Sequence, residues 1–164
     1  MRVLIIHGSK LGGTAGIADG LAATLTDSGI EVTIRPAADM LSPEGFDAAI
    51  IGGGLYADRW HKPAKKYVKR FAALLKPMPV WLFSSGPLDD TYLDNLPPTQ
   101  QVAEFMEMVD GRDHVTFGGR LEEDAKGFLA GSMAKSRAGD WRDDDQIEEW
   151  AQSIAAVLVH NEAA

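Results

Sequence analysis

Glycine and hydroxyl residues gather directly behind a short apolar run near the start of the chain. The run covers residues 3–6, and the small residues behind it are Gly8, Ser9, Gly12, Gly13 and Thr14. Glycine lets the backbone approach a ligand closely, and hydroxyl groups can donate hydrogen bonds to phosphate oxygens. Apolar residues at helical spacing follow, and the first N–H groups and the dipole of a helix favour an anion. The stretch therefore predicts a phosphate-binding loop.

Two common phosphate motifs do not fit this loop. The P-loop ends in Gly-Lys-Ser/Thr, whereas this loop ends in Gly12-Gly13-Thr14 and has no lysine in that place. The dinucleotide fingerprint G-x-G-x-x-G also fails, because the glycines fall at positions 8, 12 and 13. The phosphate must therefore belong to another class of ligand.

The loop and its flanks resemble the phosphate-loop signature of the flavodoxins. The residues that match are Ile5, Ile6, Ser9, Gly12, Thr14, Ala18 and Leu21, while His7 stands where flavodoxins usually have Phe or Tyr. In flavodoxins this loop wraps the 5′-phosphate of FMN without a cationic side chain. The resemblance implies FMN as the cofactor, with its phosphate held by Ser9, Lys10, Leu11, Gly12, Gly13 and Thr14.

The same resemblance places two later segments at the flavin ring. It implies that the inner face of the isoalloxazine lies on Gly54, Leu55, Tyr56 and Ala57, with Tyr56 as the stacking aromatic. It implies that the polar edge of the ring lies against Ser84, Ser85, Gly86 and Pro87, with Tyr92 as a second stacking candidate. For both tyrosines the alternative is packing at the edge of the domain.

Short buried strands alternate with helical patterns along the chain. The strands are expected at residues 3–6, 30–35, 47–53, 80–83 and 115–121. One helix follows the loop and ends at Gly29, others cover residues 62–76 and 97–109, and Asp143 with Gln146 begins the last. This alternation predicts an α/β fold with a parallel sheet between two helical layers. The resemblance implies a flavodoxin-like three-layer sandwich with five parallel strands in the order 2-1-3-4-5, and ligands at the switch point between strands one and three.

Composition narrows the class of protein. At 164 residues, with 45% apolar and 24% charged residues, the chain suits one domain covering residues 1–164. It has neither an apolar run long enough to span a membrane nor a secretory pattern, so a cytoplasmic location is expected. Cysteine is absent, so redox chemistry must come from a bound cofactor.

The charge distribution and the spacing of the histidines argue against two classes of ligand. The net charge of −8 comes entirely from residues 104–164, because residues 1–103 balance. The acidic second half argues against binding to nucleic acid. The four histidines lack the spacing of metal ligands, so no metal site is expected. His61 lies beside the proposed ring segment. Two roles stay open for it: a proton donor, or a loop residue with no part in the chemistry.

A basic helix and an inserted segment set the chain apart from electron-carrier flavodoxins. The expected helix at residues 62–76 has six Lys or Arg and no acidic residue. It can attract an acidic partner, a carboxylate-bearing substrate or an anionic membrane, or it can be an ordinary solvated face. An insert at about residues 122–140, with Trp141 behind it, precedes the last helix. This arrangement resembles the flavodoxin-type, menaquinone-dependent protoporphyrinogen oxidases and their flavodoxin-domain relatives.

The resemblance implies an FMN-dependent oxidoreductase, peripheral to the inner face of the membrane if the basic helix meets lipid. Electrons would pass from a reduced organic substrate, with protoporphyrinogen as the candidate, to a quinone-type acceptor. No nucleophile–base pair stands out, so no catalytic residue is assigned. One alternative is an electron carrier between proteins. Another is an interaction module without FMN, which His7, Lys10 and Leu11 favour because flavodoxins usually carry aromatic or hydroxyl residues there.

Overall fold

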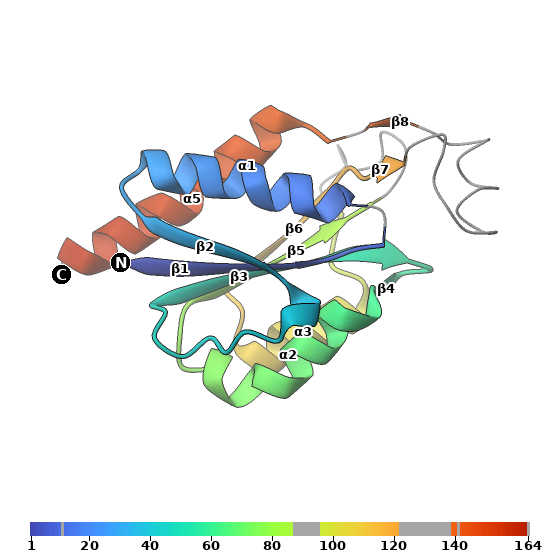
Figure 1. The fold of residues 1–164 in the computed structure, drawn as a ribbon, viewed down its shortest axis with the longest axis horizontal. Coiled ribbons are helices and arrows are strands. Elements are labelled where there is room, and N and C mark those ends of the chain that lie inside the picture. The colour runs from blue at the N-terminus through green and yellow to red at the C-terminus, as the bar shows by residue number, and fades with distance from the viewer. Residues whose placement is uncertain (11, 87–95, 122–138, 141, 164) are drawn as a thin grey trace.

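Five parallel strands form the centre of the molecule in the computed structural model, which describes residues 1–10, 12–86, 96–121, 139–140 and 142–163 (Figure 1). The strands are β1 (Arg2–Gly8), β2 (Glu31–Pro36), β3 (Ala48–Tyr56), β5 (Val80–Ser85) and β6 (Asp113–Phe117). They lie in the order β2-β1-β3-β5-β6, and each neighbouring pair is parallel. The predicted order 2-1-3-4-5 is confirmed.

Helices cover both faces of this sheet. One face carries α1 (Gly13–Asp27) and α5 (Asp144–Ala163), and the other carries α2 (Lys62–Leu75) and α3 (Gln100–Val109) (Figure 1). Side chains of β1 alternate between the two layers: Val3 and Ile5 pack on the α1 side, and Leu4 and Ile6 on the α2 side. All four are fully buried, and burial of one such side chain stabilises the fold by about 2 kcal/mol. The predicted three-layer sandwich is confirmed.

Two predicted helix ends are observed. Behind α1, Gly29 has a φ of 83° and its N–H donates to the carbonyl oxygen of Thr26, while Ile30 N–H donates to that of Leu25. This pair of bonds forms the Schellman motif, which favours glycine at that position. At the start of α5 the Asp143 carboxylate accepts bonds from the N–H groups of Asp145 and Gln146.

The predicted partner of Asp143 does not reciprocate. A capping box needs the Gln146 side chain to bond back to the helix start, but its Oε1 is buried without a partner among the described residues. Asp143 therefore caps the helix alone.

The third strand is longer than predicted. It was expected to end at residue 53, but β3 continues to Tyr56 and turns back through Ala57 and Asp58 into β4 (Arg59–Trp60), which pairs with β3 in antiparallel orientation. Ala57 and Asp58 have φ values of 48° and 61°, as a two-residue type I′ turn requires. The sheet thus has a sixth strand. It was not predicted, because this turn lacks the Asn and Gly residues that usually mark a type I′ turn.

Two other boundaries also differ from prediction. The fifth parallel strand was expected over residues 115–121, but β6 covers Asp113–Phe117, and β7 (Arg120–Leu121) pairs in antiparallel orientation with β8 (Gly139–Asp140). The helix expected from residue 97 begins at Gln100, because Pro97 and Pro98 disfavour the helical conformation in the residues before them. Most of the predicted insert at 122–140 lies outside the described residues.

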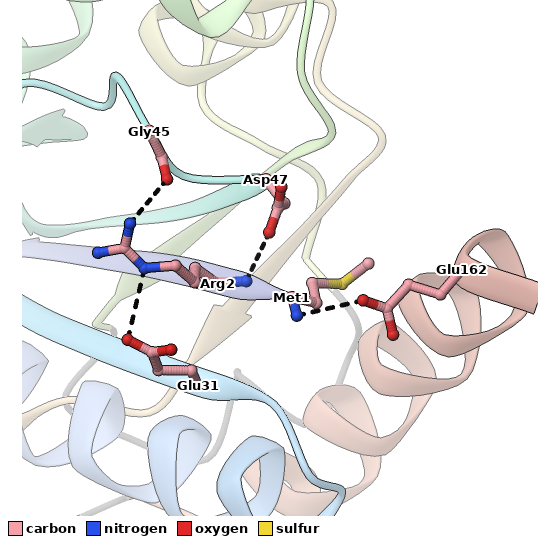
Figure 2. A network of polar contacts seen from close by, with 6 residues as sticks. All are labelled: Met1, Arg2, Glu31, Gly45, Asp47 and Glu162. Atoms are coloured by element: carbon pink, nitrogen blue, oxygen red, sulfur yellow. Dashed lines mark hydrogen bonds and ion pairs between the residues drawn. The ribbon is translucent and has the colours of Figure 1, made fainter.

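A small polar network surrounds the amino end of β1, opposite the carboxyl ends of the strands (Figure 2). The N–H of Arg2 donates to Asp47, and its guanidinium donates to the carbonyl oxygen of Gly45 and pairs with Glu31. The amino group of Met1 pairs with Glu162 near the end of α5 at 3.1 Å. Exposed pairs of this kind contribute little stability each. Together they connect β1 to β2, to the segment before β3 and to α5.

Candidate functional site

Three predicted ligand segments meet at one edge of the sheet. Parallel β1, β3 and β5 are neighbours, so residues 9–14 behind β1, residues 54–57 at the end of β3 and residues 84–86 at the end of β5 all lie at the carboxyl edge of the sheet. The chain order reverses between β1 and β3, which is where open α/β sheets bind ligands. Among the predicted site residues, Leu11 and Pro87 lie outside the described residues, as do Tyr92 and Trp141.

The loop behind β1 has the backbone geometry of an anion site. Gly12 precedes α1 with a φ of 78° and a ψ of −3°, a left-handed conformation that suits glycine. Its N–H donates to Ser9 Oγ at 3.2 Å, which shapes the loop. The first turn of α1 contains no acidic residue, so the helix itself has no carboxylate that offsets the positive end of its dipole.

Thr14 joins this loop to the end of β5. Its side chain is fully buried, and its Oγ1 lies 3.1 Å from Ser85 Oγ. One hydroxyl donates to the other, so the pair keeps one proton for a further acceptor. Two of the three predicted segments are therefore in direct contact.

Gly54 brings the third segment against the same loop. A Cβ atom at this position would lie 3.0 Å from the Ser9 Cβ, 3.3 Å from the Tyr56 ring and 3.4 Å from Thr14 Oγ1. A larger residue would push the loop and the strand apart. The backbone of β3 therefore forms part of the wall of the predicted cradle.

Aromatic rings explain the two glycines before Gly54. A Cβ at Gly52 would lie 2.0 Å from the Phe83 ring, and a Cβ at Gly53 would lie 2.3 Å from the Trp60 indole. The rings cover opposite faces of β3, because successive side chains of a strand point to opposite faces. Trp60 is only 2% exposed and packs on Phe105, so it forms part of the core on the α2 side of the sheet.

Tyr56 lies between the predicted phosphate loop and the start of α2. Its hydroxyl oxygen accepts a bond from the N–H of Lys10 at 2.9 Å, and the Lys10 ammonium lies 5.4 Å from the centre of its ring. The His61 ring meets it edge-on at a centroid distance of 6.0 Å. The half-buried Tyr56 is thus positioned at the predicted ring site, with Leu55 beside it in β3.

A buried chain of hydrogen bonds supports the end of β5. The Trp60 indole N–H donates to Ser84 Oγ at 2.9 Å, and Ser84 Oγ lies 3.0 Å from His114 Nε2. Desolvation lowers the pKa of His114 to about 4, although Asp113 opposes the shift, so the imidazole is neutral at pH 7. Sequence reasoning missed His114, because a single polar residue in a strand gives no signal of its partner. Gly86 ends the segment with a φ of 117° and donates its N–H to the carbonyl oxygen of Phe117.

The two histidines near the loop are also disfavoured as cations. Burial lowers the pKa of His7, against the attraction of Asp19 and Asp39. Burial and the nearby Lys10 lower the pKa of His61, which precedes α2. Both line a hollow of about 100 Å³ beside the loop, whose other walls are Gly8, Ser9, Pro36, Ala37, Ala38 and Pro63.

Helix α2 extends a band of positive charge away from this edge. The helix has five cations, of which all but Lys65 are exposed: Lys62, Lys65, Lys66, Lys69 and Arg70. None of them forms an ion pair with another described residue. Positive side chains at the start of a helix oppose its dipole, so this arrangement gives the helix no stability. No helix in the described ranges is both long and apolar enough to cross a membrane.

Solved structures share this architecture. Rubredoxin oxygen:oxidoreductase from Desulfovibrio gigas matches with a TM-score of 0.67 at 16% identity, covering 99% of this chain and 37% of that one. A flavodoxin from Streptococcus pneumoniae matches with a TM-score of 0.63 at 18% identity, covering 95% and 99%. A Pseudomonas aeruginosa flavodoxin variant gives 0.62 at 16%, covering 95% and 97%. At these identities the likeness shows the fold.

Sequence comparison adds a relative and a family. The chain is 29% identical over 86 residues to protoporphyrinogen IX dehydrogenase (quinone) of Escherichia coli K12, covering 51% of this chain and 48% of that protein. The chain thus matches about half the length of this curated relative. The profile described as "Flavodoxin domain" matches residues 4–136, and these matches support a flavin-type redox protein. The chain therefore belongs to the flavodoxin-domain family.

Proposed function

We propose that this protein binds FMN and passes electrons from a reduced organic substrate to a quinone-type acceptor. The observation that carries the proposal is the meeting of residues 9–14, 54–57 and 84–86 at the switch point of the sheet. Gly54 fits the group, because any Cβ there would occupy the space between strand and loop. Bound FMN would supply the transfer of electrons or hydride.

The residues of the chain have separate tasks in this proposal. The N–H groups behind Ser9 and the positive end of α1 hold the phosphate. Tyr56 and Leu55 offer apolar area to the ring, and the segment from Ser84 to Gly86 meets its polar edge. The neutral His114, through Ser84, holds that segment in position. A general base is not required, because the flavin itself accepts the electrons.

Two glycines provide a matched test of FMN binding. Gly12 and Gly29 flank α1 with φ values of 78° and 83°, and neither has a described atom within 4 Å of an added Cβ. Alanine at positive φ costs about 1 kcal/mol at either position. We expect Gly12→Ala to weaken FMN binding at least tenfold, measured by quenching of flavin fluorescence, and Gly29→Ala to leave it unchanged. Wild-type protein that does not bind FMN would refute the proposal.

The substrate and the acceptor follow from the relative's name and need their own assay. Protoporphyrinogen is proposed as the donor and a quinone as the acceptor, so that each two-electron oxidation of the donor yields one quinol. Under anaerobic conditions, donor should bleach the bound flavin and quinone should restore its colour. A flavin that reacts with neither, but exchanges electrons with a protein reductase, would instead indicate an electron carrier. Loss of FMN binding with the fold intact would indicate the interaction module.

The cations of α2, which form no ion pair with other described residues, support contact with an anionic membrane, where a quinone would be found. Each cation near such a surface contributes about 1 kcal/mol at low salt. We expect the protein to sediment with vesicles of anionic lipid, and Lys66→Glu to weaken this binding about tenfold or more. Arg35→Glu, on the edge strand β2, is the control for net charge and should have a smaller effect. Vesicle binding that does not weaken as the salt concentration rises would contradict membrane contact. Equal losses of vesicle binding in Lys66→Glu and Arg35→Glu would contradict it too.

A further inference from the structure

The N–H of Lys10 lies in the loop proposed to hold the phosphate, and it already has an acceptor. It donates to the Tyr56 hydroxyl oxygen at 2.9 Å across 46 residues of sequence. Within the same loop the N–H of Gly12 donates to Ser9 Oγ at 3.2 Å. Two N–H groups of the loop therefore point at hydroxyl oxygens, which are the same kind of acceptor as a phosphate oxygen.

The side chain of Lys10 is directed to the same tyrosine. Its ammonium group lies 5.4 Å from the centre of the Tyr56 ring, within the range of a cation–π contact. Lys10 is the only charged residue of the loop at 9–14. The backbone donor and the cation of Lys10 thus both contact Tyr56.

The backbone around Tyr56 is held firmly. Tyr56 pairs with Arg59 across the turn, and the N–H of His61 donates to the carbonyl oxygen of Gly54 at 2.9 Å. The His61 ring meets the edge of the Tyr56 ring. Because these contacts hold the backbone of Tyr56, rotation of its side chain is the movement that takes the hydroxyl away from Lys10.

We propose that Tyr56 determines how tightly the loop binds phosphate, because its hydroxyl and a phosphate oxygen compete for the N–H of Lys10. Entry of the phosphate releases the Tyr56 hydroxyl and the Lys10 ammonium together. The ammonium then pairs with the phosphate, and the ring becomes available to stack on the flavin. This inference deepens the proposed function and rests on it for the identity of the phosphorylated ligand.

The competition predicts an unusual direction of change. Phenylalanine at position 56 keeps the ring and removes the competing oxygen, so phosphate no longer has to displace an internal hydrogen bond. One such bond corresponds to about three- to tenfold in affinity. Damage to the loop would weaken phosphate binding, so a gain cannot come from loss of structure.

Inorganic phosphate is the probe, followed by the ¹⁵N chemical shift of the Lys10 amide. We expect Tyr56→Phe to bind phosphate about three- to tenfold more tightly than wild type. Tyr67→Phe is the matched control: its hydroxyl donates to the Leu41 carbonyl oxygen on α2's side of the sheet, far from the loop in sequence. Phosphate affinity in Tyr67→Phe should equal that of wild type.

Equal or weaker phosphate binding by Tyr56→Phe overturns the inference, as does the absence of phosphate binding by both proteins. The proposed function fails separately, if wild type binds inorganic phosphate but not FMN. A wild type that binds FMN, with no gain in phosphate affinity for Tyr56→Phe, removes the competition and leaves the proposed function standing.

Discussion

The hydroxyl groups of Thr14 and Ser85 lie 3.1 Å apart and connect the first turn of α1 to the carboxyl end of β5. Both side chains are buried, so each depends on the other for a partner. The proposed phosphate loop and the proposed ring segment therefore cannot move independently without the loss of this bond. Its strength is open to direct measurement.

Removal of both hydroxyls should cost less than the sum of the two single removals. In Thr14→Val or Ser85→Ala the remaining hydroxyl stays buried without its partner, which costs about 1–3 kcal/mol. The double variant loses both groups, so its free energy of unfolding should exceed the additive expectation by at least about 0.5 kcal/mol. Urea unfolding of the four proteins gives this coupling. Additive effects would mean that the two hydroxyls do not depend on each other.

Alanine at the glycines of β3 should separate stability from ligand binding. In Gly53→Ala the new Cβ would lie 2.3 Å from the buried Trp60 indole, so we expect a loss of about 2 kcal/mol or more in thermal or urea unfolding. In Gly54→Ala the contacts are 3.0–3.4 Å and involve Ser9 and Thr14. That variant should lose less stability but bind FMN more weakly. If Gly54→Ala lost more stability than Gly53→Ala, the contacts with Ser9 and Thr14 would tolerate a Cβ less well than the contact with Trp60.

His114 should make the protein less stable in acid. Its pKa is lowered to about 4 in the fold and is near 6.5 in an unfolded chain, so between these values the unfolded state binds the additional proton. The free energy of unfolding should therefore fall as pH drops from about 6.5 to 4, by about 2 kcal/mol from this group. His7 and His61 act in the same direction.

The control for this titration is His114→Gln, which can still bond Ser84 but does not gain a proton in this range. Its unfolding free energy should depend less steeply on pH between 4 and 6.5 than that of wild type. Equal slopes would show that burial does not disfavour the charged imidazole.

Asp143 and Gln146 provide a matched pair at the start of α5. Asp143→Ala removes the acceptor of two helix N–H groups and should cost about 1 kcal/mol. Gln146→Ala should cost less, because Gln146 Oε1 has no partner among the described residues. Thermal unfolding measures the stability loss of each variant. A larger loss for Gln146→Ala than for Asp143→Ala would indicate that Gln146 does form the capping box.

The elements that the sequence predicted well are those specified by local patterns. Residues 3–6 alternate between two layers because both faces of the sheet are covered, and Gly29 ends α1 through local backbone bonds. The β3–β4 turn was missed because Ala57 and Asp58 are unusual at positive φ. Beyond the turn, Trp60 pairs with Leu55 and its ring lies against Gly53, and these contacts form only in the folded chain.

The site shows the same division. Glycines and hydroxyls marked the loop at 9–14 because their local chemistry is specific, and the shared strand edge placed residues 54–57 and 84–86 beside it. The bonds from Thr14 to Ser85 and from Lys10 to Tyr56 span 71 and 46 residues, and no spacing rule encodes such pairs. Whether the site residues hold FMN stays a prediction.

The pairing of β7 with β8 has a consequence for how the family can diversify. Leu121 lies opposite Gly139, so the two ends of the segment between these residues lie side by side. A change in the number of residues between these two positions does not have to alter the spacing of any sheet strand or helix. The added chain entropy is also small, about 0.6 kcal/mol for each doubling of length. Evolution can therefore lengthen, shorten or replace the sequence between Leu121 and Gly139, and protein engineers can use the same junction to graft new sequence into the domain.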